Sequence, residues 1–177
     1  MTPKEFEERY PWILEWIQQT IAQHASRAYT IASLGFKRLP DYFNAAILRS
    51  AKVVYVLDLP KPPLSALGLS QFSEFENMNA SGITYLDTFF SKEEMRGNEP
   101  HHFHELVHVI QWRALGPKQF LQKYADDLNA FGYRNSPLEV MAYTLENVFQ
   151  NSSNPFDVAA VVRDQLAELY DVTSRGN

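Results

Sequence analysis

Apolar residues in the first part of the chain recur at helical spacing. Thr2 and Glu5 are placed for a capping box, in which the two side chains bond backbone N–H groups of the first turn. We expect Pro11 to break or kink this helix because proline has no N–H, so that a second segment runs from about residue 11 to residue 24. The apolar stripe of that second segment predicts a buried face, made of Trp12, Ile13, Trp16, Ile17 and Ile21.

Two apolar runs further along the chain predict strands. The first covers residues 52–57, is rich in β-branched side chains, and is stopped by three prolines. The second covers residues 82–90 and is the clearer of the two. Residues 26–40 predict irregular chain, and a short helix capped by Asp41 follows them. Residues 64–80 have the composition of a loop, and a loop of this length is often functional or a lid.

The second half of the chain predicts four helices. Asn98 is a suitable N-cap, and Gly116 followed by Pro117 is a stop signal, so the first of these helices covers about residues 99–116. Three more helices begin near residues 117, 137 and 155, where a proline in the first turn costs no hydrogen bond.

This order of elements predicts an α+β fold that is rich in helix and has a small sheet. Hydrophobic residues make up 45% of the chain, which is enough to bury a sizeable core. A length of 177 residues fits a single domain, residues 1–177, with N-terminal and C-terminal helices packed on a core of about residues 50–150.

Charge and composition exclude several classes of partner and chemistry. The formal net charge of −5 argues against nucleic acid or an anionic membrane as the main partner. The chain has no cysteine, which removes disulfides, thiolate metal sites and cysteine nucleophiles. Neither a signal peptide nor an apolar run of the ~20 residues that span a membrane is visible. We therefore expect a cytoplasmic protein without a membrane partner.

The candidate chemistry lies in a group of histidines on the predicted helix 99–116. Four of the five histidines of the chain fall between residues 101 and 108. His104 and His108 are four residues apart, so they lie on one face of a helix and can bind one metal ion. Glu105 is turned by about 100° from His104, a position that suits a base acting on metal-bound water rather than a ligand.

A catalytic zinc site needs a third protein ligand. A third histidine six residues after His108 is excluded, because Ala114 stands there. The remaining candidates are downstream carboxylates: Asp126, Asp127, Glu139, Glu146 and Asp157. We choose Glu139, because it begins a helix that can pack against the first one, and because small Ala142 lets the two helices approach closely. The alternative is that Glu139 forms a capping box with Ser136.

The motif His104-Glu105-x-x-His108, followed downstream by Glu139-x-x-Ala142, resembles the glutamate-type zinc metallopeptidases, or gluzincins. It is most similar to their small, minimal members, and the resemblance covers roughly residues 82–150. The resemblance implies a zincin-like fold with the HExxH motif on a central helix.

The same resemblance implies how the site is built. One Zn²⁺ ion would be held by His104, His108 and Glu139, and Glu105 would be the general base. Residues 82–90 would form the edge strand along which a peptide or protein substrate lies antiparallel.

The chain departs from the gluzincin pattern in two respects. Many gluzincins have an aspartate four residues after the third ligand, near a zinc histidine, whereas Tyr143 stands there in this chain. No single residue is marked as the donor that would stabilise the oxyanion; the candidates are His101, His102, Tyr133, Arg134 and Tyr143.

Three interpretations of the function follow. The leading one is a zinc metallopeptidase that hydrolyses peptide bonds with Glu105 as general base. The second is a zinc-binding protein without peptidase activity, which uses the site structurally or to recognise a partner. The third is a helical domain in which the motif occurs by chance.

Overall fold

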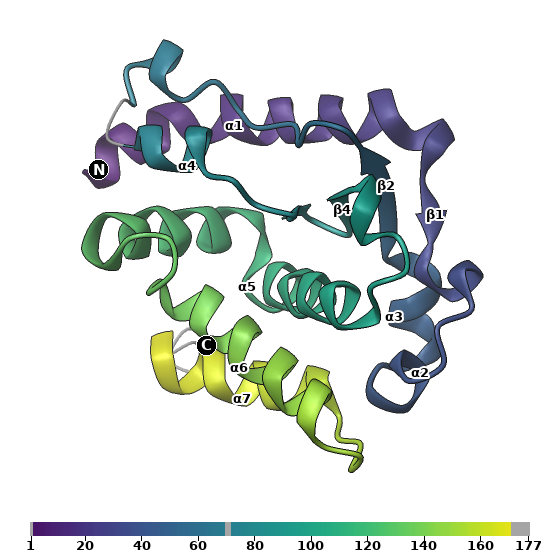
Figure 1. Ribbon diagram of the computed structural model, residues 1–177. Helices are drawn as coiled ribbons and strands as arrows, with labels where there is room; N and C mark the ends of the chain where they lie inside the picture. The colour runs from purple at the N-terminus through teal and green to yellow at the C-terminus, as the bar shows by residue number, and fades with distance from the viewer. Residues whose placement is uncertain (1, 70–71, 171–177) are drawn as a thin grey trace.

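Helix α5 (Glu99–Phe131) lies at the centre of the fold, between a sheet and two further helices. The computed structural model describes residues 2–69 and 72–170 of the chain. Figure 1 shows α1 (Pro3–His24) on one face of the sheet and α5 on the other. Helices α6 (Pro137–Asn151) and α7 (Val158–Tyr170) pack on the side of α5 that faces away from the sheet. The structure thus confirms a helix-rich α+β fold with a small sheet.

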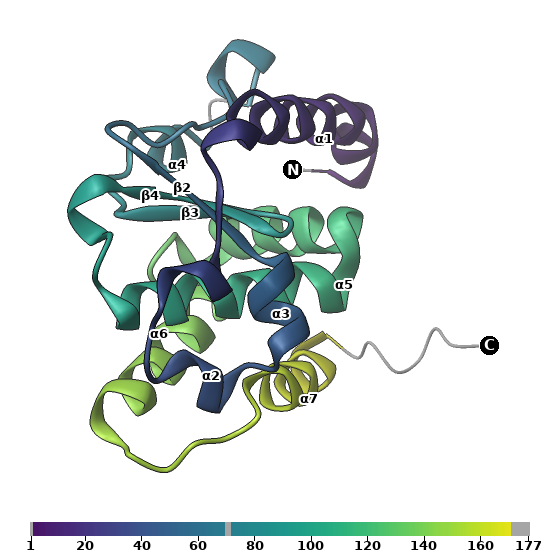
Figure 2. The ribbon, with the colours of Figure 1, turned by 90° about the vertical axis from the view of Figure 1, so that its right-hand side faces the viewer.

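The sheet has four strands in the order β1-β2-β4-β3. Their bounds are β1 (Tyr29–Thr30), β2 (Lys52–Val56), β3 (Gly82–Tyr85) and β4 (Thr88–Lys92). Strands β2 and β4 are parallel, with Lys52 opposite Thr88, whereas the other two pairs are antiparallel. The view in Figure 2 shows the sheet between α1 and α5. Strand β3 is therefore an edge strand that lies next to α5.

The prediction of one strand over residues 82–90 was wrong, because this segment forms a hairpin. Leu86 and Asp87 make a turn between β3 and β4, and Leu86 has a φ of 57°. A left-handed residue in a hairpin turn is usually glycine or asparagine, so Leu86 gave no turn signal in the sequence. The short strand β1 was also missed, since it falls in a segment predicted to be irregular.

The N-terminal helix is continuous, contrary to the predicted break at Pro11. The capping box of Thr2 and Glu5 is present, and α1 runs through Pro11 to His24. Pro11 and Glu7 are both exposed, so water can bond the carbonyl of Glu7 that Pro11 leaves without a donor.

The predicted single helix capped by Asp41 is in fact two short helices, α2 (Leu39–Tyr42) and α3 (Ala45–Ser50). Asn44 is the N-cap of α3 and accepts a hydrogen bond from the N–H of Ile47 at 3.0 Å. The described part of the loop over residues 64–80 contains helix α4 (Ser73–Asn77). Short 3-10 helices are described at Ala25–Arg27, Ile31–Leu34, Ser65–Leu67 and Glu93–Met95.

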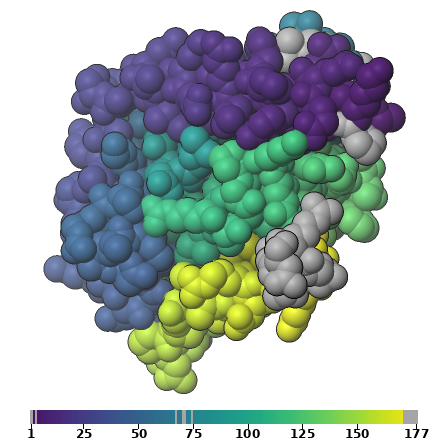
Figure 3. Space-filling view, turned by 180° about the vertical axis from the view of Figure 1, so that it is seen from behind, coloured from purple at the N-terminus to yellow at the C-terminus, as the bar shows by residue number. Residues whose placement is uncertain are grey.

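The two helices predicted on either side of Gly116 are the two halves of α5. Asn98 caps the first half by accepting a hydrogen bond from the N–H of His101 at 3.1 Å. Gly116 interrupts the helical conformation with a φ of 73°, and Gly132 ends the helix in the same left-handed region. Seen from behind in Figure 3, α1 lies along α5. Lys118 on α5 forms an ion pair with Glu7 on α1.

Every residue from 101 to 112 is buried, because the sheet covers one side of the first half of α5 and α6 the other. Aromatic rings fill the end of this layer, where Phe103 stacks on Phe149 with ring centroids 4.5 Å apart. Among the described residues, no helix combines the length and the apolar character that crossing a membrane requires.

We predict that Phe103→Ala lowers the free energy of unfolding by about 3–5 kcal/mol, because it leaves a cavity in the fully buried layer. The matched control is Phe131→Ala on the same helix, whose side chain is 53% exposed and which should cost little. Urea denaturation followed by circular dichroism measures both. Equal losses in the two variants would contradict this description of the core.

Candidate metal centre

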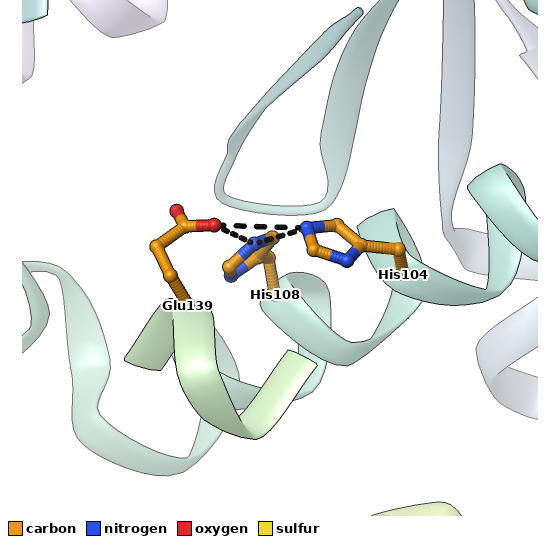
Figure 4. Close-up of side chains that lie close together, drawn as sticks. All are labelled: His104, His108 and Glu139. Carbon is orange, nitrogen blue, oxygen red and sulfur yellow. Dashed lines mark hydrogen bonds and ion pairs between the residues drawn. The ribbon is translucent and has the colours of Figure 1, made fainter. Parts of the chain in front are cut away.

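Three buried side chains from two helices converge on one point. Figure 4 shows His104 and His108 on α5 and Glu139 on the first turn of α6. The Nε2 atoms of the two histidines are 3.1 Å apart. Oε2 of Glu139 lies 3.7 Å from His104 Nε2 and 3.5 Å from His108 Nε2. This group could hold a metal ion, and it is the one such group found among the described residues.

The capping interpretation of Glu139 was wrong. Ser136 makes no side-chain capping bond, and its N–H donates to the carbonyl of Tyr133. Instead, the hydroxyl of Tyr124 donates to Glu139 Oε1 at 3.0 Å, while Glu139 Oε2 is buried without a hydrogen-bond partner. One oxygen is thus held in place and the other is left facing the two histidines.

The outer nitrogen of His108 is held by Gln111. His108 Nδ1 lies 2.8 Å from Gln111 Oε1, which makes Nδ1–H the donor and leaves Nε2 free to bind an ion. Gln111 is fully buried, and its amide nitrogen donates to the carbonyl of Leu138 at 3.0 Å. Gln111 therefore fixes the second histidine relative to the helix that carries Glu139.

The outer nitrogen of His104 faces a carboxylate that the sequence did not assign to it. His104 Nδ1 lies 3.2 Å from Glu146 Oε2, a distance for an ion pair, although the two groups are not aligned for a hydrogen bond. Tyr143 packs its ring against the His104 ring, with centroids 4.5 Å apart. Glu146 is thus the carboxylate beside the outer nitrogen of His104, and Tyr143 contacts the same ring.

The pKa of each side chain in the group depends on the charges of its neighbours. Burial alone would lower the pKa of His104, but the carboxylates of Glu139 and Glu146 outweigh burial and raise it to about 10. Burial alone would raise the pKa of Glu139, but His108 and His104 hold it well below its usual range. Without a metal, the buried carboxylate is thus balanced by protonated imidazole, and a divalent cation binding there would displace that proton.

Glu105 lies beside the metal group and against the edge strand. Thr84 on β3 donates its hydroxyl to Glu105 Oε2 at 2.6 Å. Gly82, two residues earlier on the same face of β3, leaves room for the carboxylate: a Cβ there would lie 2.2 Å from Glu105 Oε1. Glu105, the predicted base, is thus buried and held by β3.

The other two histidines of the cluster have different surroundings. His102 donates Nδ1–H to the carbonyl of Asn98 at 2.7 Å and accepts from the hydroxyl of Tyr55 at 2.8 Å. Burial lowers the pKa of His102 to about 4, so it is a neutral core residue. His101 Nε2 bonds Ser91 Oγ at 2.9 Å, and its ring lies close to Gly82.

Two cavities of opposite character meet at the metal group. One has a volume of about 60 Å³, is walled mainly by apolar side chains, and includes His108 and Glu139 in its lining. The other has a volume of about 480 Å³ and a more polar lining, with His101, Arg134 and Glu146. His104, Glu105 and Tyr133 line both cavities. The metal group thus borders two cavities, although its three side chains are themselves buried.

These cavities place the remaining predicted residues. Of the five candidate oxyanion donors, Tyr133 lines both cavities, His101, Arg134 and Tyr143 line the polar one, and His102 lines neither. The loop over residues 64–80 contributes Phe75 and Met78 to the wall of the apolar cavity.

The other carboxylates that were considered as third ligand stand elsewhere. Asp127 accepts a hydrogen bond from the Tyr170 hydroxyl, and Asp157 accepts one from the N–H of Ala160 at the start of α7. Asp126 is exposed on α5.

The sequence did not reveal three residues that hold the site in place. Gln111 bonds His108, Thr84 bonds Glu105, and Tyr124 bonds Glu139. One signal was available: Gln111 follows His108 by three residues and so shares its helix face. Thr84 and Tyr124 gave none, because their contacts depend on the hairpin and on the turn at Gly116.

Searches against models of protein families, against curated proteins and against solved structures find no match to this chain. The interpretation of the site therefore depends on its own geometry.

We predict that His108→Ala lowers the affinity for divalent metal by more than about 100-fold, since even outer contacts to metal ligands are worth about 10–100-fold. The control is His24→Ala on α1, which should bind metal like the parent protein. Each protein is dialysed against zinc, cobalt, nickel and manganese, and elemental mass spectrometry then measures its metal content. Undiminished metal content in the His108 variant would show that this group is not the binding site.

Proposed function

We propose that this protein is a zinc-dependent metallopeptidase that hydrolyses a peptide bond with Glu105 as general base. The observation that carries the proposal is that His104, His108 and Glu139 offer three ligand atoms to one point, with Glu105 beside them. A zinc ion bound there would polarise a carbonyl group and activate water.

The donor set fits zinc. Two imidazoles and one carboxylate are typical ligands of catalytic zinc, and with bonds of about 2.0–2.1 Å a tetrahedral site separates its ligands by roughly 3.3–3.4 Å. The separations here are 3.1, 3.5 and 3.7 Å, so small shifts would suffice to bind the ion. Glu139 Oε2 has no hydrogen-bond partner to give up.

The chain's own residues supply the other requirements of hydrolysis. Glu105 can accept a proton from the attacking water and pass it to the leaving amine, and Thr84 holds the carboxylate in position for both transfers. Among the candidate donors to a developing oxyanion we choose Tyr133, because it is the one of the five that lines both cavities beside the metal group.

Strand β3 offers the backbone groups that a peptide needs. Ser81 accepts a hydrogen bond from the N–H of Lys92, and pairing alternates along an antiparallel strand, so Gly82 and Thr84 turn their backbone groups to the free edge. The carbonyl of Thr84 already accepts a hydrogen bond from Trp112 Nε1 at 3.1 Å, so the backbone groups left for a peptide are those of Gly82 and the N–H of Thr84. A peptide substrate can add to this edge as a further strand.

We predict that Glu105→Gln keeps its zinc and loses turnover by about 10²–10⁴-fold, because the amide cannot accept the proton. Cleavage is measured on a mixed library of quenched fluorescent peptides, and zinc content on the same samples. Glu94→Gln, at an exposed position, is the control.

A fully active Glu105→Gln variant would rule out the assigned base. Zinc binding without cleavage by the parent protein would favour a structural or recognition role for the site. Absence of zinc binding would favour the chance occurrence of the motif.

We also predict that Gly82→Ala reduces kcat/KM by about 10²-fold, because the new Cβ displaces the Glu105 carboxylate. Zinc content should remain close to that of the parent, because the nearest atoms to the new Cβ belong to Glu105 and His101 and not to the metal group. We expect a lower Tm, because the Cβ would also lie 2.8 Å from Cε1 of the buried His101 ring. Gly97→Ala, where a Cβ meets nothing within 4 Å, is the matched control. Unchanged kcat/KM in the Gly82 variant would show that Glu105 need not occupy this position.

A further inference from the structure

We propose that the substrate carries a bulky apolar side chain on the N-terminal side of the cleaved bond, and that this side chain enters a two-part apolar cavity between α1, β3 and the second half of α5. This inference depends on the proposed peptidase function and adds the substrate class to it.

The first step is the difference between the two sides of the metal group. On β3, residues 83–85 line the apolar cavity, whereas residues 79–81, which precede the strand, line the polar one. Along α5, Trp112 and Phe120 line the apolar cavity, whereas His101 lines the polar one. Strand and helix therefore agree on which side is apolar, and Gly82 and Glu105 mark the boundary.

The second step is that the apolar cavity continues beyond the metal group. A further cavity of about 70 Å³, with an almost wholly apolar lining, extends to α1, where Phe6 and Ile13 line it. The two cavities share four wall residues: Phe75, Tyr85, Leu121 and Tyr124. The metal group thus lies beside the first of two neighbouring apolar cavities, and a side chain that occupies both has to displace these four wall residues.

The third step is size. Cavities of about 60 and 70 Å³ are each less than half of the about 150 Å³ of a cavity that holds benzene. An aromatic or long aliphatic side chain therefore needs both parts, whereas the side chain of alanine fits in the first alone.

The fourth step is the direction of the substrate. Antiparallel pairing is the more stable arrangement per residue, so the substrate runs opposite to β3. Strand β3 begins with Gly82 at the polar cavity and ends with Tyr85 at the apolar one. The N-terminal part of the substrate then lies at the apolar cavity, and the amine that leaves lies at the polar one.

The test uses two series of hydroxamates on the zinc-loaded protein, with affinities measured by calorimetry. In one series, acetylated alanine, leucine and phenylalanine hydroxamates place the side chain on the N-terminal side. In the other series, the same side chains are attached on the C-terminal side of the hydroxamate group, which takes the place of the cleaved bond. We expect phenylalanine to bind more than about tenfold tighter than alanine in the first series only.

Variants of α5 locate the effect. Ala125 lines only the distant part of the cavity, so Ala125→Leu should fill it and remove the preference for phenylalanine while leaving the alanine compound unaffected. Ala130→Leu, the same change at an exposed position of α5, is the matched control. Leu121→Ala should enlarge the passage and strengthen the preference; Tm checks that each variant is folded.

Titration of the metal-free protein with N-acetyl-phenylalanine and N-acetyl-alanine, followed by NMR, tests the cavity without zinc or turnover. Three results would each overturn the inference. The first is equal affinity for all members of the first hydroxamate series together with equal affinity for the two acetylated amino acids. The second is a preference for phenylalanine in the second hydroxamate series, and the third is a preference that persists in the Ala125→Leu variant. Loss of zinc binding, or turnover that does not depend on Glu105, would instead count against the proposed function.

Discussion

The carboxylate of Glu139, buried against two imidazoles, is the interaction on which the rest of this structure depends. A buried charge is tolerated only where it is paired, and here the pair is made between α5 and α6. Gln111 bonds His108 and the carbonyl of Leu138, and Tyr124 bonds Glu139. Both residues lie on α5, and each forms a hydrogen bond to α6. Because the carboxylate is buried, its attraction for a cation is weakly screened, and a divalent cation could replace the proton of the imidazole.

The hairpin is the second requirement, because it joins the base to the substrate edge. Thr84 and Gly82 share the face of β3 that meets α5, where one donates to Glu105 and the other leaves space for it. Tyr85 lies on the opposite face, against Trp16 of α1. The alternation of side chains along one short strand thus separates contacts to the base from contacts to the core.

Local patterns in the sequence predicted what depends on local physics. The capping box at Thr2, the cap at Asn98 and the break at Gly116 are determined within one turn of chain, and all three are present. Spacing placed His104 and His108 on one face, and the need for a third ligand pointed to Glu139, which the structure brings to them. The turn at Leu86 and the contacts of Thr84, Tyr124 and Glu146 could not be found in this way, because they depend on segments that meet only in the folded chain.

The break at Gly116 links the fold to the site. An unbroken helix would carry its second half straight on, but Gly116, with a φ of 73°, changes the direction of the chain. Figure 1 shows the second half of α5 set off from the first and lying below α1 and α4. That change brings Tyr124 to Glu139 and places Phe120 and Leu121 in the wall of the apolar cavity. One left-handed glycine therefore supports the third ligand and gives one side of the metal group its apolar character.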